Sequence, residues 1–158
     1  MLHPQARALL DLIQANGVPP THTLPVEEAR RFYRERRRVT QPEPPPVGSV
    51  QELQCSGPHG PIALRLYKPL TPLAGPAADL LPVMVYFHGG GWTIGDLDTH
   101  DCLCRELANG SGCAVLSVDY RMGPENRFPC AVDDAMAATI WCRDQARELG
   151  LDASRMAG

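Results

Sequence analysis

Three consecutive glycines, Gly89, Gly90 and Gly91, stand between His88 and Trp92 and directly follow an apolar run. Glycine has no Cβ, so the backbone can adopt positive φ there and bring its N–H groups close to a bound atom. Neighbouring N–H groups that point the same way form a pocket for negative charge. Two kinds of site fit this pattern: a cradle for a phosphate group, and an oxyanion hole for the tetrahedral intermediate of acyl transfer.

The surrounding residues favour the oxyanion hole. A phosphate loop of the GxxxxGK type needs a lysine after the glycines, and the only lysine of the chain is Lys68. A dinucleotide site needs GxGxxG at the start of a helix, and this pattern is missing too. His-Gly-Gly-Gly at the end of a buried strand is instead the oxyanion motif of lipases and esterases.

The elements that position this motif can be predicted from the hydrophobic pattern. Residues 82–87 and 113–118 are continuously apolar, which is typical of strands buried on both faces of a parallel sheet. Alternating patterns predict a β-hairpin, and helical patterns predict two helices. The hairpin strands are 49–55 and 62–67, and the helices are 99–109 and an amphipathic 131–149. We therefore predict an α/β fold with a mostly parallel central sheet and helices on both faces.

A separate helical arm is predicted before this sheet, with helices over 4–16 and 26–38 and a proline-rich connector over 41–48. In the second helix, acidic residues lie at the N-terminal end and Arg36, Arg37 and Arg38 lie at the C-terminal end. This distribution matches the helix dipole. We therefore interpret the basic run as a solvated helix face rather than as a site for an anionic partner.

Charge and composition exclude several classes of function. A net charge of -3 argues against a nucleic-acid partner. No stretch approaches the roughly 18 to 20 apolar residues of a transmembrane segment, and the N-terminus lacks the features of a secretory signal, so we expect a cytoplasmic protein. The six cysteines are irregularly spaced, and Cys102 and Cys104 match neither a redox nor a zinc motif. We expect no metal and no cofactor.

From about residue 47 onward, the chain resembles the hormone-sensitive lipase family of α/β hydrolases, in particular its bacterial carboxylesterase branch. HGGGWTIGDLDTHD, residues 88–101, is similar to the first signature of that family. DYRMGPENRFPCAVDDA, residues 119–135, is similar to the second, with Met-Gly in place of the usual Leu-Ala. The resemblance implies an α/β-hydrolase fold, with residues 1–46 as an N-terminal helical cap arm and linker and residues 47–158 as the N-terminal half of the core.

The resemblance also implies roles for the motif residues. The backbone N–H groups of Gly90 and Gly91 are expected to donate to the oxyanion, while Gly89 allows the turn. His88 is expected to orient the loop rather than to act as the general base, and Trp92 to line the acyl or alcohol pocket. A buried polar network beside the site is expected from Asp119, Tyr120, Arg121 and Glu125.

In this family the nucleophilic serine lies in Gly-x-Ser-x-Gly after the next strand, and the acid and histidine follow it. The chain ends at LDASRMAG, before such a turn. We therefore expect the remaining C-terminal half of the hydrolase in the same particle, and the resemblance allows a homodimer. The implied activity is hydrolysis of short to medium acyl esters, with a small-molecule ester as substrate. Two alternatives stay open: a catalytically inactive ligand-binding protein of the same fold, and an inactive fragment.

Overall fold

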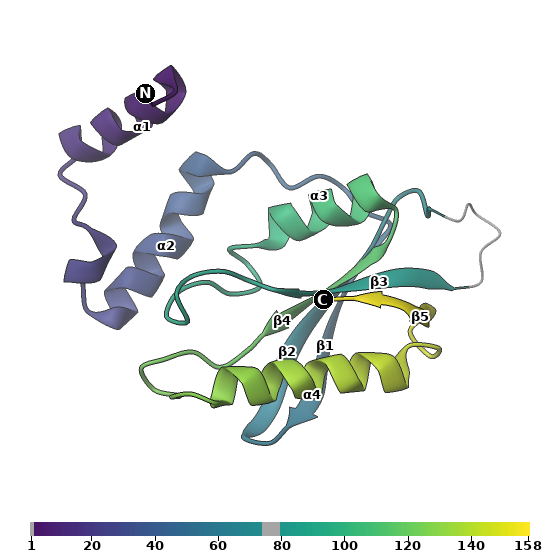
Figure 1. The fold of residues 1–158 in the computed structure, drawn as a ribbon. Helices are drawn as coiled ribbons and strands as arrows, with labels where there is room; N and C mark the ends of the chain where they lie inside the picture. Colours follow the sequence, from purple (N-terminus) through teal and green to yellow (C-terminus); the bar gives the residue numbers. More distant parts are fainter. Residues whose placement is uncertain (1, 74–79) are drawn as a thin grey trace.

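The computed structural model describes residues 2–73 and 80–158 of the chain (Figure 1). After two N-terminal helices the order is hairpin, strand, helix, strand, helix, as predicted, and a further strand follows. They are α1 Pro4–Ala15, a 3-10 turn Thr21–Thr23, α2 Val26–Thr40, β1 Ser49–Gly57, β2 Gly60–Lys68, β3 Leu81–Phe87, α3 Asp101–Ser111, β4 Ala114–Asp119, α4 Cys130–Gln145 and β5 Leu151–Ala157.

The five strands form one mixed sheet in the order β1-β2-β4-β3-β5. The predicted hairpin β1–β2 is antiparallel, and β2 also runs antiparallel to β4. Strand β3 lies between β4 and β5 and is parallel to both. The glycine motif therefore leaves the sheet at the carboxyl end of a central parallel strand, where open α/β sheets place their ligand sites.

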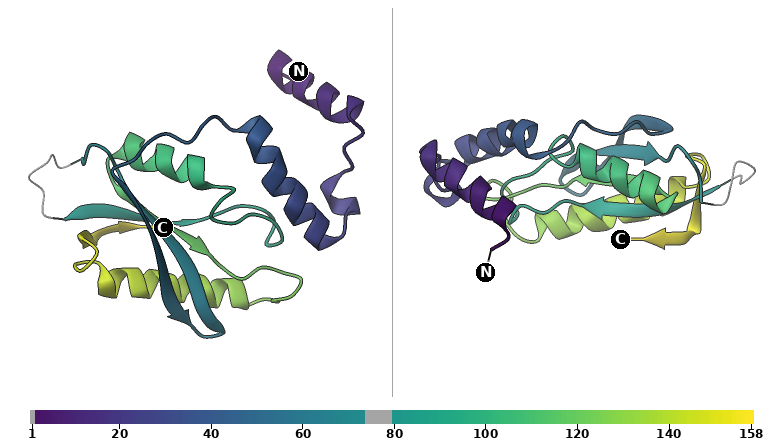
Figure 2. Two further views of the ribbon diagram at one scale, coloured as in Figure 1. Left: turned by 180° about the vertical axis from the view of Figure 1, so that it is seen from behind. Right: turned by 90° about the horizontal axis from the view of Figure 1, so that it is seen from above.

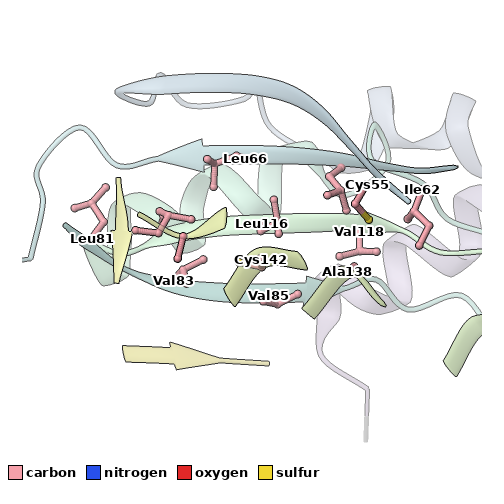
Figure 3. Packing of buried hydrophobic residues seen from close by; sticks show 14 of the residues in the cluster. Cys55, Ile62, Leu66, Leu81, Val83, Val85, Leu116, Val118, Ala138 and Cys142 are labelled. Atoms are coloured by element: carbon pink, nitrogen blue, oxygen red, sulfur yellow. The ribbon is translucent and has the colours of Figure 1, made fainter. Parts of the chain in front are cut away.

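Helices cover both faces of the sheet, with α3 on one side and α4 on the other (Figure 2). On the α4 face, Ala138 and Cys142 pack against Leu116 and Val85 (Figure 3). On the α3 face, Cys104 and Ala108 belong to a second cluster with Tyr67 and Val115. Strand β4 is buried on both faces, which explains why its sequence is apolar apart from Ser117 and Asp119.

Helix α4 differs from its prediction in two ways. It ends at Gln145 rather than at Leu149, and a turn leads from there to Gly150, which has a φ of 71°. The helix is also apolar on two sides rather than amphipathic. Its second apolar row consists of Val132, Met136 and Ile140, which are 49%, 58% and 43% exposed. A helix that is apolar all round is characteristic of an element buried between two layers.

The N-terminal arm lies at the carboxyl end of β3, where α2 runs beside the loops that leave the sheet (Figure 1). Helix α1 contains no buried residue, and its leucines Leu9, Leu10 and Leu12 are 42%, 47% and 51% exposed. The arm therefore contacts the sheet domain through α2. In the described part of the chain, no helix is long and apolar enough to cross a membrane.

Candidate active site

The glycine motif forms one wall of a pocket of about 510 Å³. The opposite wall is the second apolar row of α4, including Val132 and Met136, and the floor includes Phe87 and Tyr120. The two sequence stretches that resemble the family signatures are thus brought together, although about thirty positions separate them. The pocket lining is mainly apolar.

The backbone of the motif takes conformations that favour glycine, but not at the first of the three positions. Gly90 has a φ of 137° and Gly91 a φ of 60°, whereas Gly89 has no positive φ. A Cβ on Gly90 would lie 1.8 Å from the carbonyl oxygen of Ile94, while one on Gly89 would meet nothing within 4 Å. The positive-φ residues of the turn are therefore Gly90 and Gly91, and the role expected for Gly89 stays a prediction.

The carbonyl groups of Gly90 and Gly91 accept hydrogen bonds from residues of the same loop. The Gly90 carbonyl accepts from Thr93 N at 3.2 Å and from Ile94 N at 3.1 Å. The Gly91 carbonyl accepts from the Thr93 hydroxyl at 3.2 Å. In the described part of the chain, by contrast, the N–H groups of Gly90 and Gly91 have no protein acceptor. Two adjacent donors at a pocket wall are the arrangement that an oxyanion hole requires.

His88 is buried to 2% exposure, and its Nε2 atom is buried without a hydrogen-bond partner in the described part of the chain. Its ring stacks on Tyr120 at 4.6 Å and on His100 at 5.2 Å between ring centroids. The Tyr120 hydroxyl donates to the His88 carbonyl, and Nδ1 lies 3.0 Å from the carbonyl oxygen of Gly89. A Cβ on Gly95 would lie 2.4 Å from Nδ1, so close packing requires glycine there. These contacts suit a residue that fixes the loop better than one that moves through a catalytic cycle.

Trp92 lines two neighbouring pockets. It is 67% exposed and is the only non-glycine residue in the described part of the chain with a positive φ, 54°. Its carbonyl accepts from Gly123 N at 2.7 Å. On one side lies the pocket against α4, and on the other a groove of about 730 Å³ lined by Val26 of the arm and by Phe128. If an ester carbonyl were bound next to the glycine motif, one pocket could hold its acyl group and the other its alcohol group.

The expected polar network is divided into separate contacts. The Nη1 of Arg121 donates to both carboxylate oxygens of Asp134, a fully buried residue, at 2.6 and 2.8 Å, and this pair joins the loop after β4 to α4. Asp119 takes no part in that pair, and burial raises the pKa of its carboxyl. Glu125 instead reaches the N-terminal arm, where hydrogen bonds from Arg30 lower its pKa. These groups fix loops around the pocket.

Sequence reasoning missed the arginines of α2 that face the site. Arg30, Arg34 and Arg37 lie on one side of the helix and contact the loop that follows the glycines. Arg34 pairs with the carboxylate of Asp96, and Arg37 donates to the carbonyl of Asp98. The interpretation as a solvated face is therefore wrong for Arg30, whose side chain is 17% exposed, whereas the Arg34 side chain is 59% exposed. The side chain of Arg38 lies outside the described part. The spacing of Arg30, Arg34 and Arg37 by four and three residues was the signal that could have revealed a common face.

The cysteines show no arrangement for catalysis. All six are free thiols, and Cys104 is fully buried against the sheet. Burial raises the pKa of the Cys104 thiol to about 11, so it is protonated at neutral pH. Within the described residues, no group of three or more His, Cys, Asp or Glu side chains could hold a metal ion.

Comparison with known proteins identifies the fold and the relatives of this chain. Residues 84–157 match the family described as alpha/beta hydrolase fold. Esterase LipI of Mycobacterium tuberculosis is 43% identical over 135 residues, which are 85% of this chain and 41% of LipI. An ethyl acetate hydrolase of Pseudomonas putida is 38% identical over 164 residues, covering 99% of this chain and 50% of that protein.

A solved structure supports the same relationship. An ester-hydrolase from the metagenome of Lake Arreo, complexed with a derivative of bipyridine phosphonate, superimposes with a TM-score of 0.90 at 44% identity. The match covers 99% of this chain and 50% of that structure. The chain thus spans about half the length of the curated relatives it matches, or somewhat less.

Proposed function

We propose that this chain, whose fold is that of the α/β hydrolases, supplies the oxyanion-binding part of a serine carboxylesterase that acts on short to medium acyl esters. The observation that carries the proposal is the pair of backbone N–H groups at Gly90 and Gly91, which line an apolar pocket and have no acceptor in the described part of the chain. Relatives named as esterases and an ethyl acetate hydrolase support the choice of substrate class.

In the proposed reaction, the ester carbonyl oxygen accepts from the N–H groups of Gly90 and Gly91. A serine hydroxyl attacks the carbonyl carbon while a histidine takes its proton, and the carbonyl oxygen becomes the oxyanion. Collapse of the intermediate expels the alcohol, which takes that proton, and water then hydrolyses the acyl-enzyme by the same steps. Each donor to the oxyanion typically contributes about 10²- to 10³-fold in turnover.

The serine, the acid and the histidine of this proposal lie in a companion segment, the C-terminal half of the hydrolase. Two surfaces support its presence: the exposed apolar row of α4, and β5, which in the described part of the chain pairs only with β3. An unpaired edge of this kind promotes aggregation. Since Met84 pairs with Ala157, the position three residues after Ala157 would lie opposite Phe87 in this register, just before the glycine motif.

The role of the glycines can be tested in the full-length protein with Gly91→Pro. Proline cannot adopt the φ of 60° found at Gly91, and it removes the N–H group. We expect kcat on p-nitrophenyl acetate to fall by at least about 100-fold while KM changes little. Unchanged turnover would contradict the proposal. A wild-type protein that binds esters or carboxylates without turning them over would support the alternative of an inactive ligand-binding relative.

The companion segment can be tested by intact mass measurement of the purified particle. We expect either a longer polypeptide that contains this chain or a second polypeptide bound to it. A stable monomer of 17.2 kDa with no companion would contradict this part of the proposal.

A further inference from the structure

Arg30 of α2 joins three segments that are far apart in the sequence. Its Nε donates to the carbonyl of Thr93 at 2.9 Å, and its Nη2 donates to the carbonyl of Gly123 at 3.0 Å. The same guanidinium forms a bidentate pair with Glu125 at 2.9 and 2.8 Å and a further contact with Glu27 at 3.1 Å. With only 17% of the side chain exposed, these partners surround it.

Two of the carbonyls in the oxyanion loop depend on contacts from outside the loop. The loop itself satisfies the carbonyls of Gly90 and Gly91. The carbonyl of Trp92 accepts from Gly123 N, and the carbonyl of Thr93 accepts from Arg30. Because Arg30 also holds the carbonyl of Gly123, it supports one outside contact directly and the other through Gly123.

The hydrogen bonds to the carbonyls of Trp92 and Thr93 influence the direction in which the N–H groups of the oxyanion loop point. Each peptide carries its carbonyl and its N–H on opposite sides, so a peptide that rotates moves both. Trp92 has a positive φ of 54°, a conformation that a bulky residue keeps only when its surroundings impose it. The peptides that carry the Trp92 and Thr93 carbonyls also carry the N–H groups of Thr93 and Ile94, and both of these N–H groups donate to the carbonyl of Gly90. The Gly90 carbonyl shares its peptide with the N–H of Gly91, so loss of the outside bonds also releases this donor.

We propose that Arg30 is a positioning residue that couples the docking of α2 to the geometry of the oxyanion hole. Arg30 acts through Thr93 and Gly123 and does not touch the substrate. The inference rests on the proposed function for its catalytic consequence, whereas its structural consequence, an ordered loop, can be measured independently. The carboxylate of Glu125 keeps the guanidinium oriented as a bidentate partner.

The test compares Arg30→Met with Arg31→Met in the full-length protein. Arg31 is an exposed neighbour whose guanidinium lies over the Phe32 ring at 5.2 Å from the centroid, so it is a matched control on the same helix. Hydrogen exchange measured by mass spectrometry reports on the amides of Thr93 and Ile94, which donate to the carbonyl of Gly90. Steady-state kinetics on p-nitrophenyl acetate report kcat and KM.

For Arg30→Met, we expect faster exchange in the loop and a fall in kcat of about 10- to 100-fold, with KM within about threefold of wild type. Arg30→Lys keeps the charge but lacks the planar fork, so it should recover only part of kcat. Arg31→Met should match the wild type in both measurements. Glu125→Gln leaves α2 unchanged and should shift both readouts in the same direction by a smaller amount.

Wild-type exchange and wild-type kcat in Arg30→Met would overturn the inference, and so would faster exchange with unchanged kcat in an active protein. A wild-type protein without ester turnover would refute the proposed function instead. In that case the exchange of Thr93 and Ile94 still decides whether Arg30 orders the loop.

Discussion

Gly90→Ala is the substitution that tests the shape of the glycine loop most sharply. The new methyl group would lie 1.8 Å from the carbonyl oxygen of Ile94, a backbone atom that cannot simply rotate away. The φ of 137° at this position also disfavours any residue with a Cβ. Backbone strain of about 1 to 3 kcal/mol and overpacking of a similar size together predict a loss of about 2 to 6 kcal/mol unless the loop moves.

If the loop moves, the strain is relieved, but the Gly90 N–H is displaced from the pocket and can no longer stabilise the oxyanion. We expect kcat of the full-length protein on p-nitrophenyl acetate to fall by about 10²- to 10³-fold, with a lower unfolding midpoint in urea. Gly89→Ala meets nothing within 4 Å and has no positive φ, so its free energy of unfolding should change by less than about 0.5 kcal/mol. Wild-type kcat together with wild-type stability in Gly90→Ala would refute the reasoning.

Three further substitutions test other parts of the structure. Gly110 is an exposed residue of helix α3, and a Cβ added there would meet nothing within 4 Å. Gly110→Ala should therefore raise the free energy of unfolding by about 0.5 to 1 kcal/mol without changing kcat. Destabilisation would contradict the described helix α3. Asp134→Ala leaves Arg121 without its buried carboxylate and should cost about 3 to 5 kcal/mol in urea unfolding, and a loss below about 1 kcal/mol would refute the pair. Burial, followed by the neighbouring His88, lowers the pKa of His100, so the unfolded chain binds more protons as pH falls below about 6.5. Stability should therefore fall as the pH decreases below about 6.5, and His100→Gln should lose less in thermal unfolding; an equal loss would show that His100 is not responsible.

The sheet domain could be predicted because a strand that is buried on both faces has a nearly unbroken run of apolar residues. The mainly apolar strands β3 and β4 and the alternating hairpin all appear where the pattern indicates them. Helix α4 was harder, because its second apolar row, including Met136 and Ile140, reduces the periodic signal that marks an amphipathic helix. Its end was misplaced since the chain turns before the glycine that usually marks a helix stop.

The candidate site was only partly predictable for a different reason. The position of the glycine motif follows from local sequence, but its support comes from residues that are distant in the chain. Arg30 reaches the loop from 63 residues away, and nothing around it distinguishes it from the exposed arginines of the same helix. A dipole-matched helix and a helix that clamps a loop have the same composition, and only the tertiary contacts separate them.

The most direct test of the oxyanion hole is a crystal structure of the full-length protein after reaction with a p-nitrophenyl phosphonate, whose adduct places a negatively charged phosphoryl oxygen where the oxyanion forms. We expect this oxygen about 2.7 to 3.1 Å from the backbone nitrogens of both Gly90 and Gly91. An adduct whose phosphoryl oxygen lies beyond about 4 Å from both nitrogens would contradict the assignment of this loop as the oxyanion hole.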